Sequence, residues 1–209
     1  MIQKCISILF KGIRKYFLKL KYCIDSLICL LIFYLQNVKH QSFTTKGLPF
    51  VSIARNGKCI IGKKFTMNNG LQGNPIGRPQ RCHLFVCYGA TLTIGENVGI
   101  SSTAIIAAQS ITICDNVKIG GGVCIYDTDF HSLNFIHREH TILDNLHKIN
   151  NPVLIKQNSF IGAHSTILKG VTIGANSIVG ACSVVTKDIP DFEIWAGNPA
   201  KFIKKLNEF

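Results

Sequence analysis

The chain has 209 residues, of which 47% are hydrophobic and 16% are charged, and this balance excludes a wholly disordered protein. Its length suits one domain with short appendages. Lys and Arg number 23 against 11 Asp and Glu, so the formal net charge of +12 indicates an anionic partner, either a nucleic acid or a membrane surface.

Half of this net charge lies in residues 1–40, which carry seven Lys or Arg residues and a single acid, Asp25. At 100° per residue, the basic side chains fall opposite an apolar helical face. That apolar face holds Ile2, Ile6, Leu9, Ile13, Phe17 and Leu20, and the basic face holds Lys4, Lys11, Arg14 and Lys15. The pattern predicts a basic amphipathic helix, for which two interpretations stay open. It either lies on an anionic membrane surface as a peripheral anchor, or packs on its own protein with a solvated basic face.

An apolar run follows from Ser26 to Leu35, and it is too short to span a bilayer, which needs roughly 18–20 residues. No cleavage site of the signal-peptide type follows it. We therefore expect residues 1–50 to form an interfacial or docked helical segment.

Nine cysteines are scattered singly through the chain, without a C-x-x-C motif. Their odd count and spacing indicate neither a disulfide framework nor a zinc ribbon. Cysteine used in this way is a small apolar residue in a reducing compartment. The expected location is the cytoplasm, including the inner face of its membrane.

A six-residue repeat organises the rest of the chain. Aliphatic residues recur at Ile155, Ile161, Ile167, Ile173, Val179 and Val185, and earlier at Ile94, Ile100, Ile106, Ile113, Ile119 and Ile125. A small or β-branched residue usually stands four places later, and Asn97, Asn116, Asn158 and Asn176 immediately precede such positions. Three hexapeptides would make one triangular coil of about 18 residues, with the aliphatic side chains inside. Asn tolerates the left-handed backbone that the corners need.

The repeat resembles that of the left-handed parallel β-helix acyltransferases. The tail Thr186–Pro190 followed by Ala196–Lys201 resembles the closing motif of their sugar and polysaccharide O-acetyltransferase branch. The resemblance implies an all-β, left-handed parallel β-helix over residues 51–190, an N-terminal helical segment, and a cap at 191–209 with a short C-terminal helix. It also implies a homotrimer.

The register is interrupted by a histidine-rich active-site loop, residues 126–152. In the family a histidine that leaves the β-helix here is the catalytic base, and His131 is the matching residue. Imidazole can take a proton from a sugar hydroxyl at neutral pH and return it to a thiolate. Asp129, or alternatively Asp127, is expected to orient the ring.

The resemblance further implies acetyl-CoA as the acyl donor and no metal. The matching donor-binding positions are Ala163, Ala181, Thr186, Lys187, Lys201 and Lys204. The family often has arginine at the last two positions, and lysine keeps the charge without the bidentate fork.

The predicted function is thus direct acetyl transfer to a hydroxyl of a sugar or glycan precursor, with the amphipathic segment favouring an acceptor presented at a membrane. The alternatives are a metalloenzyme of the γ-carbonic anhydrase type and a non-catalytic β-helix scaffold. Nucleic-acid binding is not expected, because no recognised motif for it occurs.

Overall fold

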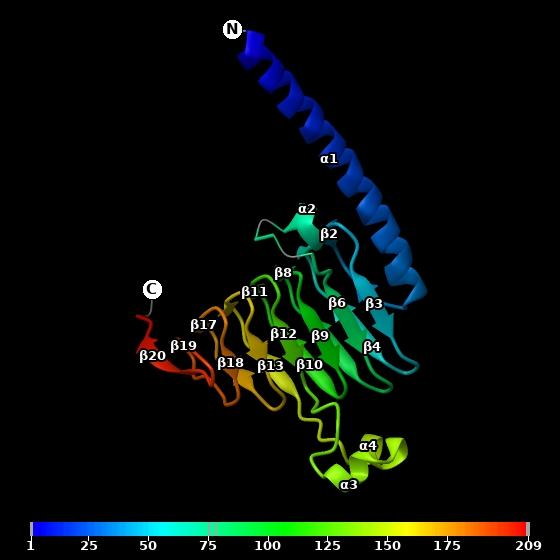
Figure 1. Ribbon diagram of the computed structural model, residues 1–209, viewed down its shortest axis with the longest axis vertical. Coiled ribbons are helices and arrows are strands. Elements are labelled where there is room, and N and C mark those ends of the chain that lie inside the picture. Colours follow the sequence, from blue (N-terminus) through cyan, green and yellow to red (C-terminus); the bar gives the residue numbers. More distant parts are fainter. Residues whose placement is uncertain (1, 75, 78, 208–209) are drawn as a thin grey trace.

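A computed structural model describes residues 2–74, 76–77 and 79–207. Short strands stack into a prism, a long helix rises from one end, and a helical loop hangs from one edge (Figure 1). The strands form three sheets, named here sheets A, B and C.

Sheet A orders β1 (Lys39–His40), β4 (Lys58–Ile61), β7 (Thr91–Ile94), β10 (Ser110–Ile113), β13 (Val153–Ile155) and β16 (Thr172–Ile173). Sheet B orders β2 (Phe43–Lys46), β5 (Phe65–Asn68), β8 (Gly99–Ser101), β11 (Lys118–Ile119), β14 (Phe160–Ile161), β17 (Ile178–Val179), β19 (Glu193–Ala196) and β20 (Lys201–Lys205). Sheet C orders β3 (Phe50–Ile53), β6 (His83–Val86), β9 (Ala104–Ala107), β12 (Cys124–Tyr126), β15 (Thr166–Ile167) and β18 (Val184–Val185).

From β1 to β18 the chain visits sheets A, B and C in turn, and each strand pairs in parallel with the strand one coil away. Ile94 pairs with Ile113, Ile113 with Ile155, and Ile155 with Ile173, so the aliphatic positions of the repeat stack in a column. These side chains are at most 1% exposed, and each contributes roughly 1.5–3 kcal/mol by burial. The predicted left-handed parallel β-helix is confirmed.

The asparagines before the corner positions have the left-handed backbone that the sequence predicted, with φ between 56° and 61° at Asn97, Asn116, Asn158 and Asn176. Their side chains also form a ladder along the prism. Asn97 donates to Asn116, Asn116 to Asn158, and Asn158 to Asn176, over 2.9–3.0 Å. These hydrogen bonds therefore link each corner to the equivalent corner of the next coil.

At the corner between sheets B and C a glycine follows the aliphatic residue of the repeat, at Gly120, Gly162 and Gly180, and close stacking of the coils explains it. A Cβ atom at Gly162 would collide with the backbone nitrogen of Ala181, and one at Gly120 would lie 2.6 Å from that of Ala163. Real Cβ atoms do not approach backbone so closely, hence only glycine fits here.

The N-terminal segment is one helix, α1 (Ile2–Leu35), whose last turns cap the open end of the β-helix. Phe33 is fully buried, with its ring 4.8 Å from that of Phe43. The first coil begins at Lys39, so the expected boundary at residue 50 is wrong. The six-residue aliphatic pattern misses this coil because a buried inward position holds Thr45, whose hydroxyl donates to the carbonyl of Gly47.

The expected C-terminal helix is also wrong, since residues Lys201–Lys205 form strand β20, antiparallel to β19. The last strand of sheet B offers unpaired backbone groups, and β20 satisfies them. Residues 51–93 form regular coils, interrupted by one excursion between β5 and β6 that contains α2 (Gly70–Gly73).

Candidate active site

The long loop leaves the prism between β12 of sheet C and β13 of sheet A, and Asp127 anchors its base. The Asp127 side chain has no exposed surface and accepts hydrogen bonds from the backbone N–H groups of Ala108, Gln109 and Ser110, over 2.6–2.8 Å. Both carboxylate oxygens of Asp127 are therefore used by hydrogen bonds to the neighbouring coil. Asp127 therefore does not orient His131.

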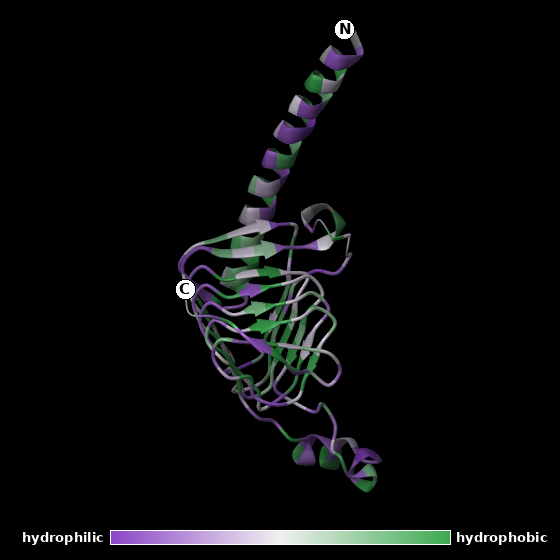
Figure 2. Cartoon of the chain, turned by 90° about the vertical axis from the view of Figure 1, so that its left-hand side faces the viewer, coloured by the Kyte–Doolittle hydropathy of each residue, from purple (hydrophilic) through white to green (hydrophobic). Residues whose placement is uncertain are grey.

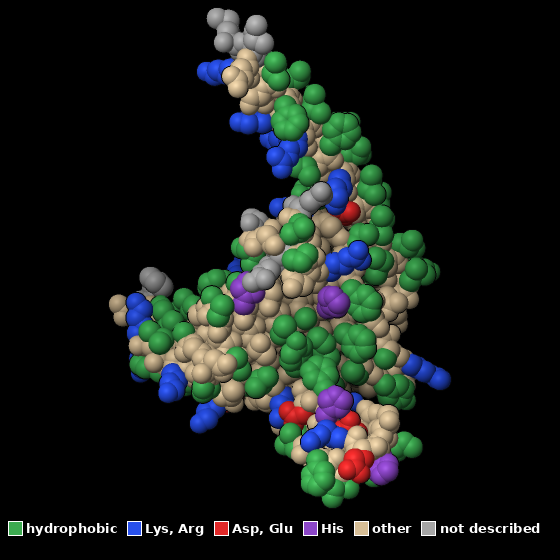
Figure 3. Space-filling view, viewed as in Figure 1, with side chains coloured by type: hydrophobic (Ala, Val, Ile, Leu, Met, Phe, Trp, Pro, Cys, Tyr) green, Lys and Arg blue, Asp and Glu red, His purple; other side chains and the backbone are tan. Residues whose placement is uncertain are grey.

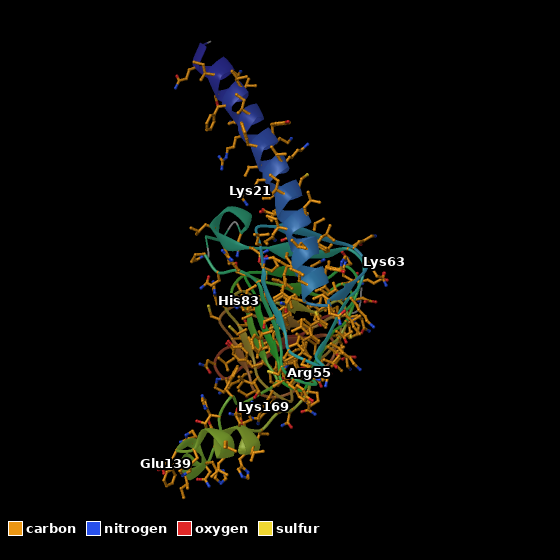
Figure 4. The ribbon with its side chains drawn as sticks, turned by 90° about the vertical axis from the view of Figure 1, so that its right-hand side faces the viewer. Lys21, Arg55, Lys63, His83, Glu139 and Lys169 are labelled. Carbon is orange, nitrogen blue, oxygen red and sulfur yellow. The ribbon has the colours of Figure 1, made fainter. Side chains whose placement is uncertain are left out.

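Asp129 faces the body of the protein as well. Its Oδ1 lies 2.7 Å from Nζ of Lys169, and its backbone N–H donates to the carbonyl of Ile149. Figure 4 shows Lys169 where the loop meets the prism, with Glu139 at the far end of the loop. The expectation that Asp129 holds the His131 ring is wrong, because the ion pair with Lys169 turns its carboxylate toward the coils.

The orienting carboxylate belongs instead to Asp144, on the short helix α4 (Thr141–His147). Its Oδ2 lies 2.7 Å from Nδ1 of His131, and its Oδ1 accepts the backbone N–H of Ser132 at 2.6 Å. The hydrogen bond from His131, followed by that from Ser132, lowers the pKa of Asp144 below its ordinary value. An ionised carboxylate at Nδ1 makes that nitrogen the donor.

The His131 ring remains open to solvent, with its side chain 69% exposed while that of Asp144 is only 14% exposed. The preceding residue, Phe130, has a φ of 64°, a left-handed backbone that a bulky residue rarely adopts. Such conformations cluster at functional sites. With Nδ1 held by Asp144, the exposed ring can present Nε2 as a proton acceptor.

Two further loop histidines, His137 and His147, support this arrangement. The rings of His137 and His147 stack with centroids 4.0 Å apart, and Nδ1 of His137 lies 3.2 Å from Oγ of Ser132. Arg138 donates to the carbonyl of Ser132 at 2.6 Å. These contacts hold α3 (Phe135–Arg138) against α4 and fix Ser132, the residue that follows His131.

An apolar groove of about 350 Å³ runs on the outer face of sheet C beside the loop base, and nothing in the sequence indicated it. Its lining is Phe85, Cys87, Ile106, Ala108, Thr128, Phe130 and Lys148. Hydrophobic side chains gather on this face directly above the loop (Figure 3). Because Phe130 lines the groove, the groove adjoins His131.

The expected donor-binding residues lie on two different edges of the prism and on strand β20. Ala163 and Ala181 stack at the corner between sheets B and C, where the N–H of Cys182 donates to the carbonyl of Ala163. Thr186 and Lys187 lie at the corner between sheets C and A, from which the His131 loop also leaves. Lys201 and Lys204 are exposed on β20. One chain therefore does not bring the two groups together.

Within the part of the chain that the structure describes, no group of three His, Cys, Asp or Glu residues is arranged to hold a metal ion. Among those same residues, no helix has the length and apolar character needed to cross a membrane.

Two family matches cover much of the coil region. Residues 139–187 match the family described as bacterial transferase hexapeptide (six repeats), and residues 91–127 match the hexapeptide repeat of succinyl-transferase. Galactoside O-acetyltransferase of Escherichia coli (strain K12) is 36% identical over 126 residues, which are 60% of this chain and 59% of that protein. The chain thus spans about three fifths of the length of this relative.

Two solved structures resemble the chain to a similar extent. A hexapeptide-repeat acetyltransferase from Vibrio cholerae O1 biovar eltor, complexed with acetyl coenzyme A, has 33% identity and a TM-score of 0.52, over 61% of this chain and 64% of that one. A maltose O-acetyltransferase from Clostridium difficile 630 has 36% identity and a TM-score of 0.51 over the same shares. Over about three fifths of its length the chain is therefore similar to hexapeptide-repeat acetyltransferases, among them galactoside and maltose O-acetyltransferases.

Proposed function

We propose that this protein is an acetyl-CoA-dependent O-acetyltransferase that modifies a hydroxyl of a sugar or a glycan precursor. The observation that carries the proposal is the pair His131 and Asp144, in which a carboxylate 2.7 Å from Nδ1 orients an exposed imidazole. The relatives add support, because one acts on galactosides by its name and another is complexed with acetyl coenzyme A.

His131 serves as the general base in this scheme. Its Nε2 takes the proton of the acceptor hydroxyl as that oxygen attacks the thioester carbonyl carbon. The carbon–sulfur bond then breaks, and the imidazolium returns the proton to the departing thiolate of coenzyme A. The Asp144 carboxylate stabilises the imidazolium while it exists and keeps the ring in one tautomer. The acetyl group passes directly, without an acyl-enzyme.

The acceptor would lie along the apolar groove beside the loop base. Aromatic side chains such as Phe85 and Phe130 offer a flat apolar surface for the C–H face of a sugar ring, and Lys148 adds a positive charge at the rim. A lipid-linked or phosphorylated glycan precursor would suit both features. Polysaccharide biosynthesis is the process that consumes such acceptors.

Acetyl-CoA would be held between neighbouring copies in a homotrimer. The edge that carries Ala163 and Ala181 and the edge that carries His131 are different corners of one prism. An oligomer that sets the first edge of one copy against the second edge of the next would complete each site. Lys201 and Lys204 would then offer positive charge to the phosphates of the cofactor.

The test is transfer of a labelled acetyl group from acetyl-CoA to a panel of free sugars, nucleotide sugars and cell-envelope glycans. We expect His131→Ala to lower turnover by roughly 10²–10⁴-fold, because that is what a general base contributes. The matched control is His140→Ala, which removes another exposed imidazole of the same loop. Near-normal turnover in His131→Ala, or an equal loss in His140→Ala, would refute the assignment.

A further inference from the structure

Helix α1 exposes an apolar stripe along nearly its whole length. Stripe residues recur at alternating steps of four and three, so they stay on one face of the helix. They are Ile6, Phe10, Ile13, Phe17, Leu20, Ile24, Leu27 and Leu31, and each is between 47% and 66% exposed. These eight residues are called the α1 stripe below.

The body of the protein cannot cover the α1 stripe, because α1 docks through its opposite face. Asp25, Cys29 and Phe33 are the buried residues there, at successive turns of the helix. The Asp25 carboxylate accepts the backbone N–H of Gly47 at 2.9 Å and pairs with Lys21 at 2.8 Å. The stripe therefore faces outward, as the hydrophobic side chains on the outer side of the helix in Figure 3 show.

The charges of α1 point to what covers the stripe. The helix carries six Lys or Arg residues, and its one acid, Asp25, is already engaged in docking. Arg14 and Lys21 lie beside the stripe on one side and Lys19 lies toward the other, where long side chains can reach past an apolar surface. The other three, Lys4, Lys11 and Lys15, lie on the opposite face of the helix. The surface that covers the stripe must therefore be apolar where it contacts the stripe and negatively charged where it contacts the neighbouring basic side chains.

A second copy of the helix fits these charges poorly. Stripe-to-stripe packing would bring Arg14 of one helix against the basic flank of the other, and the one acid of the helix, Asp25, is already paired with Lys21. Lipid phosphates supply the missing negative charge, and the acyl boundary accepts the stripe.

We propose that α1 lies flat on an anionic lipid surface, with the α1 stripe embedded and the β-helix held on the water side. The helix is roughly 51 Å long, so it offers a long line of contact while remaining in the plane of the surface. Figure 2 shows α1 above one end of the coils and the His131 loop on the far side of the body. The docking contacts of Asp25 and Phe33 fix the body to this anchor.

The experiment is co-sedimentation of the full-length protein with vesicles of phosphatidylcholine mixed with phosphatidylglycerol, and with vesicles of phosphatidylcholine alone. We expect strong partitioning to the mixed vesicles, weaker partitioning to the neutral ones, and a decrease with added salt. The variant Ile6→Glu/Leu20→Glu should partition on the order of a hundredfold more weakly, since each buried aliphatic side chain is worth roughly tenfold.

The matched control is Ile8→Glu/Leu18→Glu, which makes the same two changes on the opposite face of the same helix. The partitioning of this control to the mixed vesicles should fall much less, and only because its net charge is lower. Wild-type protein that stays in the supernatant with the mixed vesicles overturns the proposal. So does an equal loss in both double variants, or a stripe variant whose oligomeric mass falls in solution, which would mean that a second copy covers the stripe. Vesicle binding needs no acetyl transfer, so the result is independent of the proposed activity.

Discussion

At the scale of single residues, the three carboxylates of the His131 loop have different roles. Asp127 ties the loop base to three backbone N–H groups, and Asp129 pairs with Lys169. Only Asp144 contacts the His131 ring. Two carboxylates thus fix where the loop leaves the prism, and the third sets the tautomer of its imidazole.

We expect Asp144→Asn to lower kcat by about 10- to 100-fold while leaving the unfolding temperature nearly unchanged. The amide keeps the shape of the side chain but cannot stabilise an imidazolium, and it accepts a hydrogen bond less strongly. Steady-state acetyl transfer measures the change. Asp129→Asn is the matched control, and it should affect kcat much less. A larger loss in Asp129→Asn would return the orienting role to that residue.

At the scale of secondary-structure elements, the corners of the prism decide how the short strands stack. Many strands have only two or three residues, so strand pairing alone provides few hydrogen bonds per coil. The asparagine ladder adds a side-chain hydrogen bond between successive coils at one corner. The left-handed backbone at these asparagines lets the chain turn between sheets A and B.

We expect Asn158→Ala to destabilise the protein by about 2 kcal/mol in urea unfolding, from two lost side-chain hydrogen bonds and a left-handed alanine. Asn158→Gly removes the same hydrogen bonds but adopts a φ of 60° without steric cost. The alanine variant should therefore be about 1 kcal/mol less stable than the glycine variant. Equal midpoints for the two would show that the backbone conformation does not limit this corner.

At the scale of the whole molecule, the proposed site is divided between two edges of one prism. His131 and Asp144 belong to the edge between sheets C and A, and Ala181 belongs to the edge between sheets B and C. One chain therefore does not bring His131 and Ala181 together. If acetyl transfer requires both edges, each active site is complete only in an oligomer.

Mixed oligomers test this division. His131→Ala lacks the base, and Ala181→Trp places a large side chain on the exposed donor edge, so we expect each variant to be inactive alone. After co-refolding in equal amounts, about a quarter of shared sites should join an intact base edge to an intact donor edge. Acetyl transfer should reappear in the mixture. A mixture as inactive as its parents would mean that each copy holds a whole site.

The sequence alone determined the β-helix, because burial of one aliphatic side chain every six residues is a local pattern that Ile155 to Val185 repeat without interruption. It also determined the left-handed corner asparagines and the position of the loop that carries His131. These features depend on spacing along the chain, which the sequence states directly.

The tertiary structure alone decided the contacts between distant residues. Asp144 lies 13 residues from His131 and reaches it through the fold of α3 and α4, whereas Asp129, only two residues away, is drawn off by Lys169. The last residues form β20 because the open edge of sheet B offers hydrogen bonds that no local propensity records. The outward direction of the α1 stripe likewise follows from which face of the helix Asp25 and Phe33 dock, and that depends on the partner surface rather than on periodicity.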